Sequence, residues 1–319
     1  MTESVLTEEA ATGPGPSSPP PARGVLWRRL RHDKAAATGM AIIALMVLVA
    51  LLAPVLTALE GQDPTTQHAE LVDSATGGTP LGSLGGVSGS HWFGVEPKTG
   101  RDLFARLVYG ARISLGVALG ATVLQVLIGV GVGIAAGLGG RLLDGALGRL
   151  TDLTLAFPSV LFAIALMAIV PDSIPRPLIL AVVIALLAWG STARLARGQT
   201  LSLRTRDFVA AARLSGAPPL RVARREILPG LVTPVLTYAA LLVPSNMITE
   251  AGLSFLGVGV RPPTSSWGQM LSQGTTWFRP DIMYVLVPGG ALFLTLLGFT
   301  LVADGVRRVL DPRNIEVAA

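Results

Sequence analysis

Apolar residues are grouped along the chain into long runs, which alternate with shorter polar or basic segments. Several runs approach or exceed the roughly 20 residues that a helix needs to cross the hydrocarbon core of a bilayer. We therefore predict an all-α, polytopic membrane protein with six transmembrane helices. Their expected ranges are residues 38–56, 113–137, 150–170, 178–196, 230–256 and 284–303.

The segments before the second span differ strongly in composition. Residues 1–26 are acidic at first and then rich in Pro, Ser and Gly, which predicts a disordered tail. Residues 27–112 form the next unit. It comprises a basic anchor at 27–34, the first span, a long polar loop at 57–90, and a turn followed by an amphipathic helix in 91–112. We expect that helix to lie in the membrane interface.

Residues 113–303 form the core, with five further spans and a basic loop at 194–229, and residues 304–319 form a second tail. The second span is dense in Gly and Ala, which lets neighbouring helices approach closely. A short basic turn is expected before the third span, and Pro158 predicts a kink inside that span. Asp152, near the start of the same span, is expected to pair with Arg149.

Composition excludes several classes of protein and site. Only 14% of residues are charged and the mean hydropathy is +0.59, whereas a soluble domain carries about 25% charged residues. There is no cysteine, so disulfides and thiolate metal sites are excluded, and the three histidines are scattered. Neither a phosphate-binding loop nor a nucleophile–base pair can be identified. The sequence thus predicts a chain that is not itself an enzyme and has no cofactor of its own.

The distribution of basic residues predicts the orientation in the membrane. Residues 1–37, the basic turn before the third span at 138–149, loop 194–229 and the tail at 304–319 together carry 18 of the 25 lysines and arginines. Because cytoplasmic segments of membrane proteins are enriched in these residues, we expect both termini and this loop to be cytoplasmic. The net charge of +5 is then a sign of topology and not of nucleic-acid binding.

The basic loop at residues 194–229 carries eight arginines and a helix–Gly–helix pattern. Gly216 follows the first expected helix as a C-terminal cap, and prolines open the second. Arg221 and Arg225 are one helical turn apart and repel each other, unless an acidic partner surface neutralises them. The loop therefore predicts a docking knob. The alternative is a solvated basic segment held by anionic lipid.

The spacing in this loop resembles the EAA loop of ABC importer permeases, in which it forms the coupling helix that seats on a cytoplasmic ATPase. Two alanines are followed after three residues by a glycine, and nine residues later by the segment ending at Pro229. The family pattern begins with Glu where this chain has Ala210, so that carboxylate is missing. The coupling residues expected from the resemblance are Arg206, Asp207, Ala211, Ala212, Gly216, Leu220, Arg221, Arg225, Ile227 and Pro229.

Three further blocks, at residues 27–34, 91–120 and 250–270, strengthen the resemblance, as does the tail beyond residue 303. Together they look like the second, C-type permease subunit of dipeptide, oligopeptide and nickel ABC importers, over roughly residues 24–315. The resemblance implies a type I ABC importer permease fold and alternating access in a bacterial inner membrane. It also implies a homologous second permease, two cytoplasmic ATP-binding subunits that hold ATP and Mg²⁺, and an extracytoplasmic substrate-binding protein. Membrane lipid is the other expected contact, and nucleic acid is not expected.

Three polar residues within the spans are candidates for the translocation pathway: Gln125, Asn246 and Glu250. Polar and ionisable side chains inside a membrane are costly and often functional. For Gln125 and Asn246 the alternative is a hydrogen bond between helices. For Glu250 it is a structural or gating role at the turn that follows the fifth span.

The most concrete functional prediction is a permease subunit that imports di- or oligopeptides. Within the same family, import of nickel or glutathione stays open. A stand-alone secondary transporter is the alternative from another class, and it would be expected to contain inverted repeats. A membrane-embedded enzyme is disfavoured because Asp152 and Glu250 are expected near opposite faces of the membrane.

Overall fold

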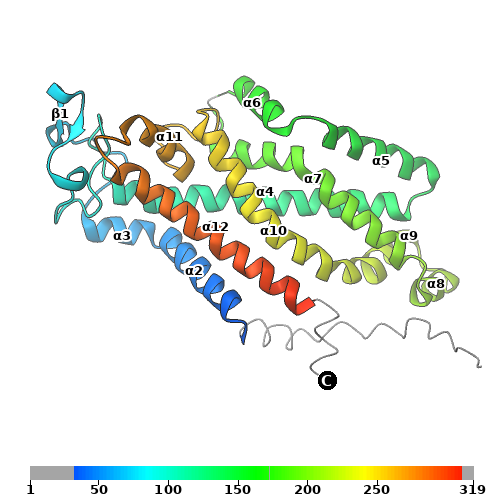
Figure 1. Ribbon diagram of the computed structural model, residues 1–319. Helices are drawn as coiled ribbons and strands as arrows, with labels where there is room; N and C mark the ends of the chain where they lie inside the picture. The colour runs from blue at the N-terminus through cyan, green and yellow to red at the C-terminus, as the bar shows by residue number, and fades with distance from the viewer. Residues whose placement is uncertain (1–31, 172, 311–319) are drawn as a thin grey trace, which may run out of the picture.

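Long helices running side by side make up most of this chain in the computed structural model, which describes residues 32–171 and 173–310 (Figure 1). The predictions for residues 1–26, for most of the basic anchor at 27–34 and for the tail beyond residue 310 lie outside the described residues. The helices are α2 (Lys34–Leu51), α3 (Ala53–Glu60), α4 (Leu103–Leu138), α5 (Arg141–Ala156), α6 (Ser159–Ile169), α7 (Arg176–Leu203), α8 (Asp207–Leu214), α9 (Pro219–Val222), α10 (Leu228–Phe255), α11 (Trp267–Trp277) and α12 (Met283–Leu310).

Five helices among the described residues are long and apolar enough to cross a membrane, and a sixth span results if the bent pair α5–α6 is counted as one. This agrees with the predicted all-α class and its six spans. The two short strands β1 (Val72–Asp73) and β2 (Thr79–Pro80) pair antiparallel in the polar loop after α3. That loop and α11 lie at one end of the bundle, the α11 end, while α8 and α9 lie at the other, the α8 end (Figure 1).

The helix predicted in residues 91–112 begins at Leu103, but it is not separate from the second span. Asp102 caps the N-terminus of α4 by accepting the backbone N–H of Ala105 at 2.6 Å, and the helix then continues for 36 residues without a break. The division expected after Arg112 therefore falls inside α4. The charged residues at its start suggested a surface helix, but they are buried among partners from distant segments.

The third span is broken rather than kinked. Helix α5 begins at Arg141, within the stretch expected to be a turn, and α5 and α6 meet at an angle of 86°. The break lies at Phe157 and Pro158, both of which have extended backbone conformations. A residue before proline is pushed out of the helical region, and proline itself offers no N–H to continue the helix.

Helices α4 and α7 pack together along a row of small residues. Gly129, Gly133 and Gly137 recur every four residues on α4 and face Thr192, Ala196 and Thr200, with the same spacing, on α7. A Cβ atom on Gly133 would lie 2.5 Å from the Cβ atom of Ala196. The close approach predicted from the small residues of the second span is thus confirmed.

The first and last spans close the bundle on another side, where α2 crosses α12. A Cβ atom on Gly39 would lie 2.6 Å from the carbonyl oxygen of Gly298, so this crossing also depends on glycine. Near one end of the crossing, Asp33 accepts hydrogen bonds from Arg308, whose Nε lies 2.9 Å from Asp33 Oδ2. This ion pair therefore holds the start of α2 against the end of α12.

Candidate functional site

The short helices α8 and α9 project from one end of the bundle, next to the ends of α4 and α7 (Figure 1). They are mounted on it by a buried apolar cluster that contains Val209, Val222, Ile227 and Leu231 and packs against residues of α4. The guanidinium of Arg204 adds a hydrogen bond of 2.9 Å to the carbonyl of Gly137, the penultimate residue of α4. A load applied to α8 or α9 would therefore be transmitted directly to α4 and α10.

The turn between α8 and α9 depends on Gly216, which has a φ of 76°. Its N–H donates to the carbonyl of Arg213, and the N–H of Ala217 donates to the carbonyl of Ala212. This is the Schellman arrangement that ends many helices, and it requires a left-handed residue that glycine adopts without steric cost. The predicted helix–Gly–helix pattern is confirmed.

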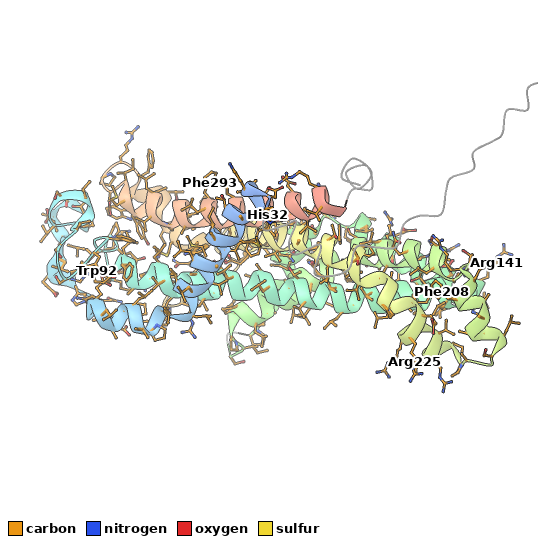
Figure 2. All side chains as sticks on the ribbon, turned by 90° about the horizontal axis from the view of Figure 1, so that it is seen from below. His32, Trp92, Arg141, Phe208, Arg225 and Phe293 are labelled. Atoms are coloured by element: carbon orange, nitrogen blue, oxygen red, sulfur yellow. The ribbon has the colours of Figure 1, made fainter. Side chains whose placement is uncertain are left out.

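The exposed surface of these helices is both apolar and basic. Phe208, Leu214 and Leu220 have exposed fractions of 46%, 90% and 69%. An open groove of about 560 Å³ is lined by Leu220, Pro218 and three arginines, Arg221, Arg224 and Arg225. Figure 2 shows Phe208 and Arg225 at this end of the molecule, far from Trp92 at the other.

Most of the residues predicted to couple to an ATPase lie on this surface, but Ile227 does not. It is buried, within a π-helical turn at Ala223–Ile227, and holds the two short helices on the bundle. Phe208 and Leu214, which the coupling prediction does not include, are exposed on this surface. Helical spacing alone could not distinguish the side that packs on the bundle from the side that is exposed, because both carry apolar residues.

Gln125 and Asn246 are buried and face each other between α4 and α10. Each side-chain amide donates to the other's carbonyl oxygen at 3.0 Å, and Asn246 also donates to the hydroxyl of Thr122 at 2.9 Å. Nearly all of their polar groups are thus used between helices of this chain. A contact of either residue with substrate stays a prediction.

Glu250 is also fully buried, and it organises the turn that follows α10. Its carboxylate accepts hydrogen bonds from the hydroxyls of Ser114 at 2.9 Å and Ser254 at 2.8 Å. Those hydroxyls in turn accept backbone N–H groups, of Trp267 and Val260 respectively. Glu250 therefore ties α4 to both ends of the loop that returns into α11, which matches the structural alternative. A contact with substrate remains a prediction here as well.

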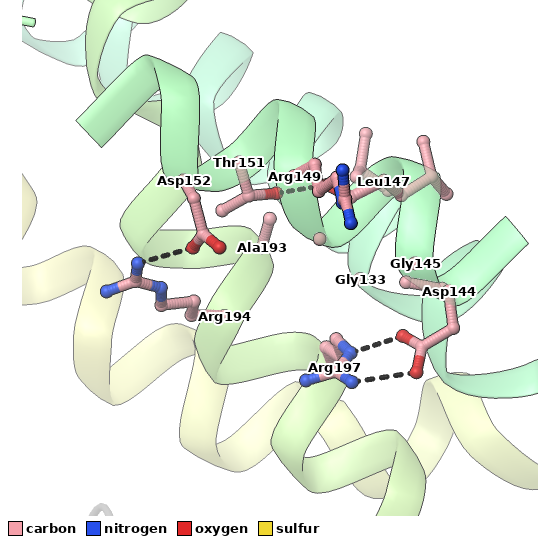
Figure 3. Close-up of a pocket in the computed structure, with 13 residues that line it drawn as sticks. Gly133, Asp144, Gly145, Leu147, Arg149, Thr151, Asp152, Ala193, Arg194 and Arg197 are labelled. Atoms are coloured by element: carbon pink, nitrogen blue, oxygen red, sulfur yellow. Dashed lines mark hydrogen bonds and ion pairs between the residues drawn. The ribbon is translucent and has the colours of Figure 1, made fainter. Parts of the chain in front are cut away.

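Two ion pairs join α5 to α7 toward the α8 end (Figure 3). Arg197 donates from Nε and Nη2 to the two carboxylate oxygens of Asp144, at 2.5 and 2.8 Å. Arg194 donates to Asp152 at 2.7 Å. The prediction that Asp152 pairs with Arg149 is therefore wrong. The true partner lies 42 residues away on another helix, which no local pattern in the sequence could reveal.

A second polar network, at the α11 end, surrounds the start of α4. Arg101 donates to Glu96 at 2.6 Å, and Arg106 donates to the side chain of Gln269 at 2.8 Å. Tyr284, at the start of α12, also donates to Glu96. These contacts connect the loop before α4 with α11 and α12, so the network fixes the loop on the bundle.

Glu60 is the last residue of α3, also at the α11 end, and it is almost fully buried. Its Oε1 accepts the N–H of Trp92 at 2.8 Å, and its carboxyl group lies beside that of Asp102. Burial, and next to it the charge of Asp102, raise the pKa of Glu60 to about 7. Asp102 is held in turn by His91, whose Nδ1 lies 2.8 Å from Oδ2.

Stability is expected to fall as the pH rises through 7, because the folded chain binds a proton at Glu60 that the unfolded chain releases near pH 4.5. The contribution is complete below pH 4.5 and is lost above about pH 7, and it amounts to at most about 3 kcal/mol. Glu60→Gln should remove this dependence and raise the melting temperature at pH 8.5, measured by thermal unfolding in detergent. Glu70→Gln, a change at an exposed carboxylate nearby, should follow the wild-type pH profile. Equal pH profiles for Glu60→Gln and the wild type would contradict the prediction.

Comparison with known proteins places these features in a family. Residues 129–316 match the family described as binding-protein-dependent transport system inner membrane component, and residues 23–72 match the N-terminal transmembrane domain of oligopeptide transport permease C. The chain is 36% identical to the dipeptide transport system permease protein DppC of Alkalihalophilus pseudofirmus, over 94% of this chain and 95% of that protein. It is 34% identical to the oligopeptide transport system permease protein OppC of Escherichia coli K12, over 91% and 92%.

The fold itself is found in a solved structure of an inward-facing MetNI methionine ABC transporter. The matched chain is 19% identical, with a TM-score of 0.51, over 65% of this chain and 97% of the other. At this level of identity the likeness establishes the fold alone, which is that of a type I ABC importer permease. With its membrane-spanning helices, its short helices at one end of the bundle and relatives that match almost its whole length, this chain belongs to the family of binding-protein-dependent transport system inner membrane components.

Proposed function

We propose that this chain is the C-type permease subunit of an ATP-driven importer of short peptides in a bacterial inner membrane, with both termini cytoplasmic. The names of its relatives, a dipeptide and an oligopeptide transport permease, support the substrate class. The concentration of lysine and arginine in residues 1–37, in loop 194–229 and in residues 304–319 supports the orientation.

The surface of α8 and α9 is the observation that carries the proposal. Exposed phenylalanine and leucine side chains at the end of a soluble knob are costly unless a partner covers them. Here Phe208, Leu214 and Leu220 lie among arginines, as expected for a surface that enters an apolar groove with an acidic rim. The partner proposed for this surface is a cytoplasmic ATP-binding subunit.

In this mechanism ATP and Mg²⁺ are bound by two such subunits, since the chain has no phosphate-binding loop of its own. Their closure would displace α8 and α9, and with them α4 and α10, on which these helices are mounted. A homologous second permease would move in the same way, so that the pathway between the two opens alternately to either side. An extracytoplasmic binding protein would deliver the peptide. The coupling surface comprises the predicted residues other than Ile227, with Phe208 and Leu214 added.

The proposal is tested by extracting the chain from its native membrane in mild detergent, identifying the proteins that accompany it and reconstituting the assembly in liposomes. We expect a second permease and ATP-binding subunits, with ATPase activity and peptide uptake stimulated by a peptide-loaded binding protein. Recovery of the chain alone, with peptide uptake that needs no ATP, would contradict the proposal and favour a secondary transporter.

A further inference from the structure

A cavity of about 340 Å³ lies between α4, α5 and α7, near the ends of these helices that lead toward α8 (Figure 3). Small residues from all three helices line it, among them Gly133, Ala193, Gly145 and Gly148. Because these side chains are small and uncharged, the floor of the cavity is smooth and constrains the shape of a ligand only weakly. None of the three predicted pathway residues lines it.

Charged side chains surround this floor. The pair Asp144–Arg197 lies at one end of the cavity and the pair Asp152–Arg194 at the other (Figure 3). A fifth group, Arg149, also lines the cavity, and it forms no ion pair with any residue that the structure describes. The cavity thus has three guanidinium groups and two carboxylates, with one cation in excess.

Such a concentration of charge in helices of a membrane bundle has a cost, and charged side chains in membrane proteins commonly line water-filled paths of substrates. The two ion pairs differ in how readily their members can leave each other and bind another charged group. Asp144 and Arg197 form a bidentate pair that is partly shielded, whereas Asp152 and Arg194 are 67% and 59% exposed. An exposed pair contributes little to stability, about 1 kcal/mol or less, so its members are available to another partner.

We propose that this cavity is a binding site for free peptides of two or three residues, with the peptide's α-ammonium group at Asp152 and its α-carboxylate at Arg149. This inference rests on the proposed function and assigns a site to its substrate class. Peptides with different side chains share only a main chain and two charged termini. A site with a smooth floor and one group for each terminus recognises those shared parts.

Dimensions and charge both fit this ligand. Asp152 and Arg149 are three residues apart on α5, a rise of about 4.5 Å, and their side chains extend the span further. A dipeptide in extended conformation measures about 7 Å. The ammonium group of a zwitterionic peptide replaces Arg194 as the partner of Asp152. The carboxylate of the peptide neutralises the unpaired charge of Arg149, and Arg194 shares that carboxylate. In the proposed orientation the site lies in the cytoplasmic half of the bundle.

The site is tested by binding of radiolabelled dialanine to the purified importer without its binding protein, with unlabelled N-acetyl-dialanine and dialanine amide as competitors. We expect each blocked peptide to compete about tenfold more weakly than dialanine, because each lacks one charge-assisted contact. Asp152→Asn should remove the preference for the free amino group alone. Arg149→Gln should remove the preference for the free carboxylate alone. Arg141→Gln, a change on the same helix outside the cavity, should keep both preferences.

The two variants alter exposed side chains, so their melting temperatures should stay close to that of the wild type, and this is checked first. Unchanged preferences in both variants would overturn the site, as would absence of dialanine binding to an importer that takes up dialanine. ATP-dependent uptake with the binding protein present is measured in parallel. If uptake is normal while the preferences do not depend on Asp152 and Arg149, the site alone fails. If no peptide is taken up, the proposed function fails and the site with it.

Discussion

Gly216→Trp is expected to reduce ATP-dependent peptide uptake at least about tenfold while leaving the membrane-spanning bundle folded. Gly216 has a φ of 76°, in the left-handed region, and nothing lies within 4 Å of the position that a Cβ atom would occupy. A tryptophan there is therefore not crowded within the chain. It strains the turn between α8 and α9 by about 1–2 kcal/mol and places a large side chain on the surface proposed to dock. Uptake and peptide-stimulated ATPase activity are measured in the reconstituted importer.

Gly61→Trp is the matched control, because Gly61 also has a left-handed backbone, with a φ of 81°, and an open surrounding. It ends α3, at the opposite end of the bundle, so it carries the same backbone strain without touching the docking surface. We expect near-normal coupling in this variant. Normal coupled ATPase activity in Gly216→Trp would contradict the assignment of α8 and α9 as the coupling surface.

Gly133→Leu is expected to prevent stable folding of the bundle, with a loss of more than about 3 kcal/mol. Even a Cβ atom at this position would lie 2.5 Å from Ala196 Cβ and 2.8 Å from two backbone atoms of α7, the carbonyl oxygen of Ala193 and the nitrogen of Arg197. Overpacking against movable side chains costs about 1–3 kcal/mol, but backbone atoms cannot move aside without separating the two helices. The yield of monodisperse protein in detergent and its melting temperature report the effect.

Gly131→Leu provides the comparison within the same helix. Gly131 lies two residues away on α4, where nothing is within 4 Å of an added Cβ atom. Its replacement also removes a glycine from a helix interior, which favours the helix by up to about 1 kcal/mol. We expect a melting temperature equal to or above that of the wild type. Similar behaviour of the two variants would show that the glycine row does not set the distance between α4 and α7.

The long spans could be predicted from the sequence because the membrane imposes a requirement that each segment meets locally. A helix that crosses the hydrocarbon core satisfies its own backbone hydrogen bonds, so its signal is an apolar run of sufficient length. The helices α2, α7, α10 and α12 follow such runs, although the first run, at residues 38–56, continues beyond the end of α2 at Leu51 into α3. The turn at Gly216 was predictable for a similar reason, because helix capping involves only neighbouring residues.

The start of α4 was misread for the opposite reason. Arg101, Asp102 and Arg106 are charged, and along the sequence charged residues indicate a surface. They can be buried because Glu96 and Gln269 pair with the two arginines and His91 pairs with Asp102. Gln269 belongs to a helix more than 160 residues away along the chain. Pro158 predicts a kink, but the size of the bend, 86° between α5 and α6, could not be predicted from the sequence.

The sequence by itself determined the class of this protein, most of its spans and the turn at Gly216, because apolar length and helix capping act within short stretches of chain. Only the tertiary structure decided which polar groups find partners. It paired Asp152 with Arg194 and Asp144 with Arg197, and it enclosed Gln125 and Asn246 between helices. Hydrogen bonds and ion pairs act over about 3 Å, and residues 42 to 121 positions apart reach that distance only when the helices have packed.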